Sequence, residues 1–154
     1  MEFKPVVFTV GNQEYGIDIE LVEEIEKVQD IVRVPNSNAD IKGIINLRGS
    51  VIPIYSLRHH FNLEEVNQTE ESKFIVVNTG GMRIALEVEK VEEIQEVNES
   101  MIHDIPPIVK SDGTKYADKV INVNGKLIIV LNIEHLFSPE QLHDIKKFVE
   151  DIKE

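Results

Sequence analysis

The adjacent histidines His59 and His60, with Glu64 a few residues further on, are the residues whose types could hold a metal ion. Neighbouring residues on a helix point about 100° apart, so two adjacent histidines rarely share one ion. His135 also occupies the position of His59 in a second copy of the same segment, which favours a packing or surface role. We therefore expect no metal and no cofactor. A metal-dependent enzyme around these residues is the alternative, and metal analysis of the pure protein would test it.

Two pairs of glutamates, Glu23–Glu24 and Glu92–Glu93, are the next residues that could do chemistry. Catalytic carboxylates face one substrate and need different environments, which a duplicated pair does not supply. The chain has no cysteine, no Gly-X-Ser-X-Gly motif and no Gly-X-X-X-X-Gly-Lys motif, so a nucleophile or a phosphate cradle is not indicated. We expect a protein without catalytic activity, in which the paired acids are solvated or contact a partner.

The elements that carry these residues occur twice in the chain. Val6–Val28 aligns with Ile75–Val97 at a shift of 69 residues, which places Val22 on Val91. Ile44–Phe61 aligns with Val120–Phe137 at a shift of 76 residues, which places Ile44 on Val120. A repeated unit of this length predicts two similar subdomains.

Most segments of each copy predict short strands, because apolar residues alternate or run together between turn residues. A helical turn is expected after each hairpin, ending at Phe61 or Phe137, and Ser138, Pro139 and Gln141 begin an amphipathic helix. The other expected elements are strands at 6–10, 15–19 and 32–35, a helical turn leading into a strand within 20–27, and hairpins at 44–55 and 120–131.

About five short strands in each copy would leave exposed edges as an open sheet, and closing them into a small barrel removes those edges. Two barrels of roughly 65 residues would be marginal alone, so we expect them to pack together and leave a groove. The predicted fold is mainly β, with two pseudosymmetric five-stranded barrels, short helical turns and a C-terminal helix. We treat 1–154 as one domain, with barrels at 12–70 and at 71–137 plus the N-terminal strand, and the helix at 138–154.

The tips of the two hairpins differ in an informative way. The second copy has Asn124 before Gly125, whereas the first has Arg48 before Gly49. A two-residue hairpin turn favours positive φ, which Asn tolerates more readily than Arg. Such a local conflict often marks a functional residue, so we hypothesise that Arg48 binds a partner carboxylate or carbonyl. The alternative is a different turn type that accepts arginine.

The chain is acidic, with a formal net charge of −12 over 154 residues and a pI near 4.8. This field repels a phosphate backbone, so we expect no nucleic-acid binding. The N-terminal residues lack the pattern of a signal peptide, and no apolar stretch approaches the roughly 20 residues that cross a bilayer. We expect a cytoplasmic protein without direct membrane insertion.

The combined motifs resemble those of CheW, the coupling protein family of bacterial chemotaxis, from Phe3 to about Phe137. The motifs are Phe8-Thr9-Val10-Gly11, Glu14-Tyr15-Gly16-Ile17-Asp18-Ile19, Val22-X-Glu24-Ile25, Ile41-Lys42-Gly43, Asn46-Leu47-Arg48-Gly49 and Pro53-Ile54. One departure is Ser56, where members of the family often carry Asp. The resemblance implies two SH3-like barrels and a non-catalytic adaptor between chemoreceptor tips and the regulatory domain of the kinase CheA, recruited to receptor arrays and able to join rings.

The resemblance also implies which residues face the receptor. By motif they are Val22, Glu24, Gly43 and Arg48, and pseudosymmetry adds Val91 and Ile94. It further implies that Gly43→Asp weakens receptor binding while the fold survives. The kinase-binding residues are not assigned. A small-barrel module that binds a peptide or ligand outside chemotaxis is the alternative function.

Overall fold

The computed structural model describes residues 3–34, 40–92, 96–106, 116–137 and 139–152, and the account below concerns these residues. The helical elements are η1 (Ile19–Leu21), α1 (Leu57–His60), η2 (Glu99–Met101), α2 (Ile133–Leu136) and α3 (Pro139–Ile152). The strands are β1 (Pro5–Val10), β2 (Gln13–Asp18), β3 (Val22–Lys27), β4 (Ile41–Leu47), β5 (Ser50–Ser56), β6 (Lys73–Thr79), β7 (Met82–Val88), β8 (Lys90–Val91), β9 (Ile102–Asp104), β10 (Ala117–Val123) and β11 (Lys126–Leu131).

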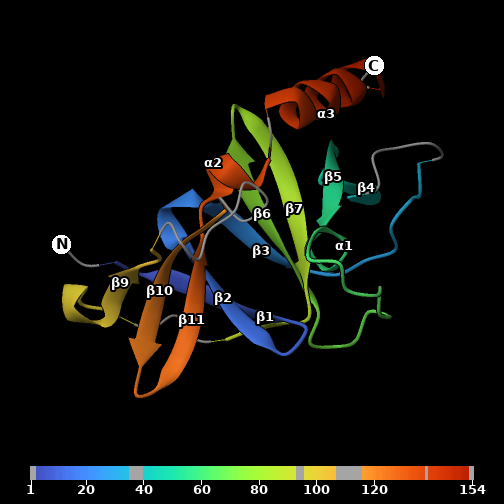
Figure 1. Cartoon of the computed structure of the whole chain (residues 1–154). Coiled ribbons are helices and arrows are strands. Elements are labelled where there is room, and N and C mark those ends of the chain that lie inside the picture. The colour runs from blue at the N-terminus through green and yellow to red at the C-terminus, as the bar shows by residue number, and fades with distance from the viewer. Residues whose placement is uncertain (1–2, 35–39, 93–95, 107–115, 138, 153–154) are drawn as a thin grey trace.

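These strands form two sheets that repeat one pattern (Figure 1). The six-stranded sheet has the order β8-β1-β2-β11-β10-β9, and the five-stranded sheet has the order β3-β6-β7-β5-β4. Their registers are equivalent at the shifts found in the sequence. Val130 lies beside Gly16 in one parallel pair, as Ile54 lies beside Ala85 in the other. The predicted fold class, mainly β with two pseudosymmetric five-stranded barrels, short helical turns and a C-terminal helix, is confirmed, with the difference that one sheet has six strands where five were expected.

Each sheet combines strands from both copies of the repeat. The hairpin β1–β2 belongs to the first copy, but its sheet is completed by β8, β9, β10 and β11 from the second. The hairpin β6–β7 of the second copy is joined by β3, β4 and β5 of the first. The sequence analysis expected barrels at 12–70 and at 71–137 plus the N-terminal strand. The strand β1 does lie with strands of the second copy, whereas β2 and the hairpin β6–β7 each lie in the other sheet from the one that those bounds give. The two copies have exchanged their first hairpins. The sequence repeat would look the same with or without this exchange, so the repeat does not predict it.

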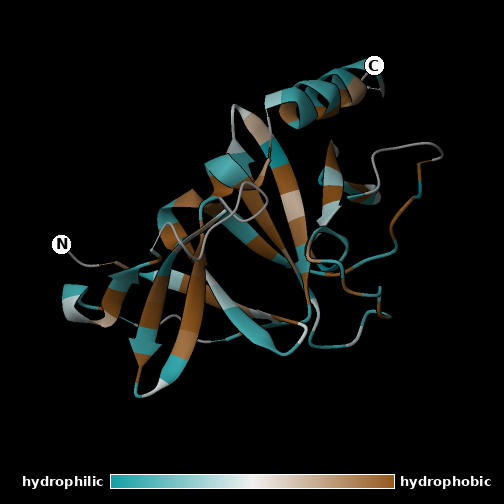
Figure 2. Ribbon diagram, viewed as in Figure 1, coloured by the Kyte–Doolittle hydropathy of each residue, from teal (hydrophilic) through white to brown (hydrophobic). Residues whose placement is uncertain are grey.

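Three clusters of buried apolar side chains hold the sheets together. One cluster belongs to the five-stranded sheet and includes Ile52, Phe74 and Ala85. A second belongs to the six-stranded sheet and includes Ile121 and Ile128. The largest joins the two sheets and α2, because it contains Phe8 from β1, Leu86 from β7 and Phe137 after α2. Alternate residues of β11 enter different clusters, Ile128 and Val130 one and Ile129 and Leu131 the other, which explains why this strand is apolar over most of its length (Figure 2).

The helix α3 lies across the end of the β6–β7 hairpin (Figure 1). Its apolar stripe of Leu142, Ile145 and Val149 packs against the largest cluster, and Ile145 is buried. The predicted amphipathic helix is thus confirmed for 139–152, whereas its expected cap Ser138 lies outside the described residues. None of the helices in the described part of the chain is long and apolar enough to cross a membrane.

One predicted strand is wrong. Of the segment 32–35, Pro35 lies outside the described residues, and Val32 forms an isolated bridge with Ile44. Two hydrogen bonds of 2.9 Å between Val32 and Ile44 make this bridge. The segment therefore covers the edge strand β4 at a single point without extending the sheet.

Candidate functional site

The strand β3 sets the geometry of the candidate site. It is an edge strand that pairs with β6, and its register shifts between Val22 and Glu24. Such a bulge bends and twists an edge strand and re-aims its side chains. Glu23, Glu24 and Glu26 all project from this strand toward arginines on neighbouring elements.

The three glutamates and two arginines form what we call the glutamate–arginine cluster: Glu23, Glu24, Glu26, Arg48 and Arg83. Arg48 pairs with Glu24 and, at 3.0 Å, with Glu26. Arg83 on β7 lies 2.5 Å from Glu24 and 2.7 Å from Glu23. Glu24 therefore bridges the hairpin tip of β4–β5 and the middle of the same sheet.

The backbone of Arg48 has the conformation that the sequence comparison anticipated. Arg48 and Gly49 have φ values of 51° and 85°, and Asn124 and Gly125 have 51° and 88°. Both turns therefore have positive φ at both central residues, which excludes the alternative of a turn that suits arginine. An L-residue with a Cβ costs about 1 kcal/mol or more in this left-handed region.

The charges of the cluster are held by hydrogen bonds as well as by ion pairs. Asn78 donates to Glu23 at 2.9 Å, and Arg83 donates to the other oxygen of the same carboxylate. The bond from Asn78, then the bond and charge of Arg83, lower the pKa of Glu23 below its ordinary value. The side chain of Arg48 is 64% exposed, whereas that of Glu24 is 20% exposed. Arg48 is thus the solvent-facing member of the pair.

Gly43 lies on β4, away from the cluster, and it is buried. A Cβ at this position would lie 2.3 Å from the carbonyl oxygen of Val32 and 2.5 Å from Ile31. The absence of a side chain therefore admits the chain's own segment 31–34 next to β4. An aspartate at Gly43 would displace that segment, so its effect is on the chain's own packing before it is on any partner.

The remaining predicted site residues are placed apart from these. Val22 begins β3 and Val91 ends β8 in the other sheet, and both are partly buried against the largest apolar cluster. They occupy equivalent places, since Val22 pairs with Val77 and Val91 pairs with Phe8. Ile94 lies outside the described residues. The structure brings Glu24 and Arg48 into contact and does not bring Gly43 or Val91 to them.

Sequence reasoning missed Arg83, Glu26 and Asn78. One signal could have found Arg83: the shift of 69 residues places it on Glu14, which has the opposite charge and pairs with Lys126. A reversal of charge between equivalent positions indicates that the two copies make different contacts. Neither Glu23 nor Glu24 is simply solvated, because both pair with arginines within the chain.

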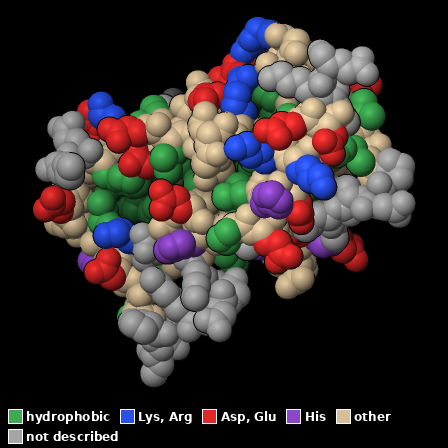
Figure 3. All heavy atoms as spheres, turned by 90° about the horizontal axis from the view of Figure 1, so that it is seen from above, with side chains coloured by type: hydrophobic (Ala, Val, Ile, Leu, Met, Phe, Trp, Pro, Cys, Tyr) green, Lys and Arg blue, Asp and Glu red, His purple; other side chains and the backbone are tan. Residues whose placement is uncertain are grey.

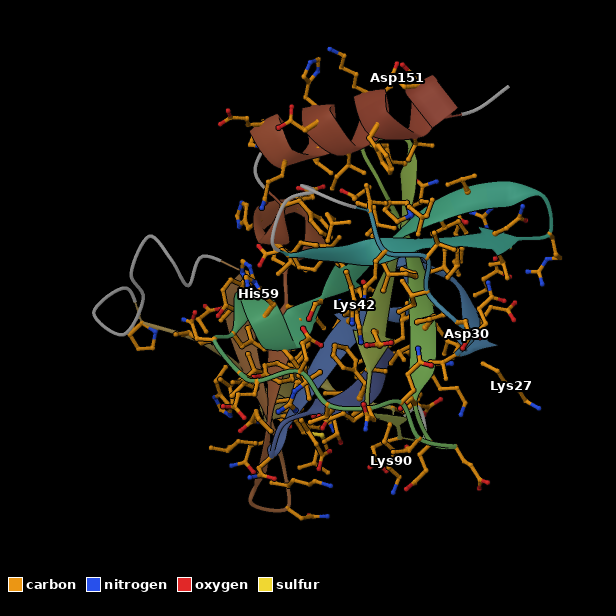
Figure 4. All side chains as sticks on the ribbon, turned by 90° about the vertical axis from the view of Figure 1, so that its right-hand side faces the viewer. Lys27, Asp30, Lys42, His59, Lys90 and Asp151 are labelled. Atoms are coloured by element: carbon orange, nitrogen blue, oxygen red, sulfur yellow. The ribbon has the colours of Figure 1, made fainter. Side chains whose placement is uncertain are left out.

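The histidines that opened the sequence analysis take part in a polar network beside α1. His59 Nδ1 lies 2.6 Å from a carboxylate oxygen of Asp40, and His60 Nδ1 lies 2.8 Å from the hydroxyl of Tyr55. The side chain of His59 is 48% exposed, and Figure 4 shows it on α1. Among the residues that the structure describes, no three or more His, Asp or Glu side chains lie together in a way that could hold a metal ion.

Comparison with known proteins agrees with this architecture. Residues 4–141 match the family model of the CheW-like domain. The chain belongs to the CheW-like family. It is 33% identical over 137 residues to Chemotaxis protein CheW of Klebsiella aerogenes, covering 89% of this chain and 82% of the relative. It is 30% identical over 148 residues to Chemotaxis protein CheW of Treponema pallidum, covering 94% and 87%.

A solved structure matches most of this chain. The crystal structure of the scaffolding protein TtCheW from Thermoanaerobacter tengcongensis has a TM-score of 0.80 and 32% sequence identity. The match covers 90% of this chain and 89% of that chain. The CheW-like family match ends at residue 141, so most of α3 lies beyond it.

Proposed function

We propose that this chain is a non-catalytic chemotaxis adaptor that couples the cytoplasmic tip of methyl-accepting chemoreceptors to the regulatory domain of the histidine kinase CheA. The observation that carries the proposal is the CheW-like match over residues 4–141. The likeness to a scaffolding protein at a TM-score of 0.80 supports the same role. We further propose that the protein acts in the cytoplasm and reaches receptor arrays, and their rings, through its partners.

The receptor-facing residues that we propose are Val22, Glu24, Gly43 and Arg48, with Val91 and Ile94 as the pseudosymmetric additions. The edge strand β3 supports such a surface. Ile25 is 38% exposed on this edge strand, so an apolar side chain stands beside the charged cluster. Exposed apolar area next to fixed charges suits the face of an amphipathic helix, which is the form of a receptor tip.

The guanidinium of Arg48 can bind a group of a receptor in addition to Glu24 and Glu26, or in place of one of them. Both of its ion pairs use Nη2, and a guanidinium carries five N–H donors in a fixed fork. A carboxylate or carbonyl of a receptor can therefore be bound beside Glu24, or in place of Glu26. Glu24 keeps its bond to Arg83 in either case, so it holds the position of the pair.

The first experiment is a calorimetric titration with the regulatory domain of a CheA-type kinase from the same organism, using wild type and Arg48→Asn in parallel. We expect saturable one-to-one binding by both, because Arg48 is proposed to face the receptor and not the kinase. A parallel titration with a soluble receptor-tip fragment should show weaker binding by Arg48→Asn. Absence of any complex between the wild type and the kinase domain would remove the coupling role.

A further inference from the structure

An open groove of about 800 Å³ lies on the side of the six-stranded sheet where η1, η2 and α2 meet. In Figure 3, hydrophobic side chains gather in a hollow at the left of the view, with acidic side chains around it. The apolar lining includes Ile19, Leu21, Ile102, Val130 and Ile133. None of the described residues that we propose for receptor binding lines this groove.

The internal symmetry of the fold gives this groove an equivalent in the other half. Because Val130 beside Gly16 matches Ile54 beside Ala85, the strands on both sides of the groove can be aligned residue by residue. Asn132 and Glu134 then occupy the places of Ser56 and Arg58. Asp18, Ile19 and Glu20 likewise occupy the places of Glu87, Val88 and Glu89. All ten residues line a cavity in their own half.

In the five-stranded half the equivalent cavity is nearly closed, with a volume of about 20 Å³. Residues 65–68 of the chain itself line it, together with Ser56 and Glu87. Ser56 donates its hydroxyl to Glu65, and Gln68 donates to Glu87 at 2.9 Å. An extended segment of the polypeptide thus fills in one half the space that stays open in the other.

The route of the chain explains the difference. After Phe61 the chain continues through residues 62–72, of which 65–68 line the cavity, before it enters β6. At the equivalent Phe137 the next described element is α3, which packs over the β6–β7 hairpin. Among the residues that the structure describes, the six-stranded half therefore has the walls of the cavity without a segment that fills it.

The charges around the two cavities differ, because in the filled half the carboxylates Glu87 and Glu89 are paired with Lys42 and Arg58. In the filled half, Arg58 donates to the carbonyl oxygen of Glu64, and Lys42 lies 3.6 Å from Glu65 (Figure 4). In the open half, Glu134 stands where Arg58 stands. Among the described residues, two lysines line the open groove, Lys4 and Lys119, against five carboxylates: Asp18, Glu20, Glu99, Asp104 and Glu134.

We propose that the open groove binds an extended segment of a partner protein, which carries apolar side chains flanked by Lys or Arg. The segment lies as residues 63–68 lie in the other half, with its apolar side chains over Ile19 and Val130 and its basic side chains at Glu134 and Glu20. In the filled half Glu65 of the internal segment lies beside Lys42, whereas carboxylates outnumber lysines around the open groove, so a basic segment is the complement of the open groove. This inference does not depend on the proposed role in chemotaxis.

The test uses two synthetic peptides and the full chain labelled with nitrogen-15. The first peptide has the sequence of residues 62–68 with both glutamates replaced by lysine, and the second has the unaltered sequence. We expect the basic peptide to shift the amide resonances of residues 18–21 and 130–134 saturably at low salt. The unaltered acidic peptide should bind at least about tenfold more weakly, since each 1.4 kcal/mol is tenfold in affinity.

Two matched variants separate the groove from the general charge of the protein. Glu134→Arg restores the residue type found at Arg58 and should weaken the basic peptide about tenfold or more, while improving binding of the acidic peptide. Glu140→Arg makes the same change in net charge on the exposed side of α3 and should leave both affinities unchanged. The proposal is overturned if the basic peptide gives no shifts, if the shifts lie outside the groove, or if both variants weaken binding equally.

Discussion

Replacing Arg48 separates what this residue does for the fold from what we propose it does for a partner. Arg48→Asn removes the ion pairs to Glu24 and Glu26 and supplies the residue that the other hairpin uses at the same φ of 51°. Exposed ion pairs are worth about 0–1 kcal/mol, and the side chain of Arg48 is 64% exposed. Relief of the left-handed backbone returns about 1 kcal/mol.

The two effects have opposite signs and similar size. We therefore expect the free energy of unfolding of Arg48→Asn to stay within about 1 kcal/mol of wild type, a change of at most about 4 °C in Tm. Arg48→Ala loses the same ion pairs but keeps the unfavourable φ, so it should be about 1 kcal/mol less stable than Arg48→Asn. Asn124→Ala should lose about the same amount, because its backbone conformation is the same.

Urea unfolding followed by circular dichroism measures all three variants, and titration with a receptor-tip fragment measures binding. Equal stability of Arg48→Ala and Arg48→Asn would refute the argument from φ. A loss of more than about 2 kcal/mol in Arg48→Asn would exceed the usual worth of exposed pairs and make the cluster a structural element. Higher stability with unchanged binding of every partner would refute the functional reading of Arg48.

Three further perturbations test other parts of the structure. Gly43→Ala places a Cβ 2.3 Å from the carbonyl oxygen of Val32, so we expect a loss of about 1–3 kcal/mol in urea unfolding, and an unchanged midpoint would contradict the contact. Burial favours the neutral form of Asp40, but hydrogen bonds from His59 and His60 lower its pKa below the ordinary value. The contribution of Asp40 to the free energy of unfolding is therefore complete above the ordinary Asp pKa of about 3.9, and it is lost as the pH falls through the lower native value. Asp40→Asn should therefore be destabilising at pH 7 and progressively less so as the pH falls below the ordinary Asp pKa, and a deficit that does not change with pH in acid would contradict this. Ile145→Ala should cost about 2–5 kcal/mol in thermal or urea unfolding if α3 is packed as described, and a near-neutral result would show that the helix is dispensable.

The features that depend on local chemistry could be predicted from the sequence. The hairpin at Asn124–Gly125, the positive φ at Arg48 and the apolar stripe of α3 each follow from a few neighbouring residues. The features that depend on distant pairing could not. The contact of Gly43 with Val32 requires the segment 31–34 to fold back onto β4, and the pairing of Arg83 with Glu23 joins residues on β7 and β3 across β6.

The exchange of hairpins is the clearest case of a feature that the sequence could not specify. β1–β2 and β6–β7 have the same pattern and register, so each could complete either sheet as far as hydrophobic alternation is concerned. The choice is made by the sum of tertiary contacts, in particular by the apolar cluster that joins both sheets.

The differences between the two copies carry more information about function than their similarities. Asn46 and Asn122 are identical, and both accept a hydrogen bond from the glycine of their own turn, at 2.9 Å and 2.8 Å, so the fold alone explains them. The repeated fold does not explain two of the differences. The turn favours Asn124 over Arg48 at the same φ, and the position of Arg58 and Glu134 would accept either residue. One difference lies at the glutamate–arginine cluster, and the other decides the charge of a cavity that one half fills and the other leaves open. A duplicated fold with two unlike faces can hold two different partners at once, which is the physical requirement for an adaptor.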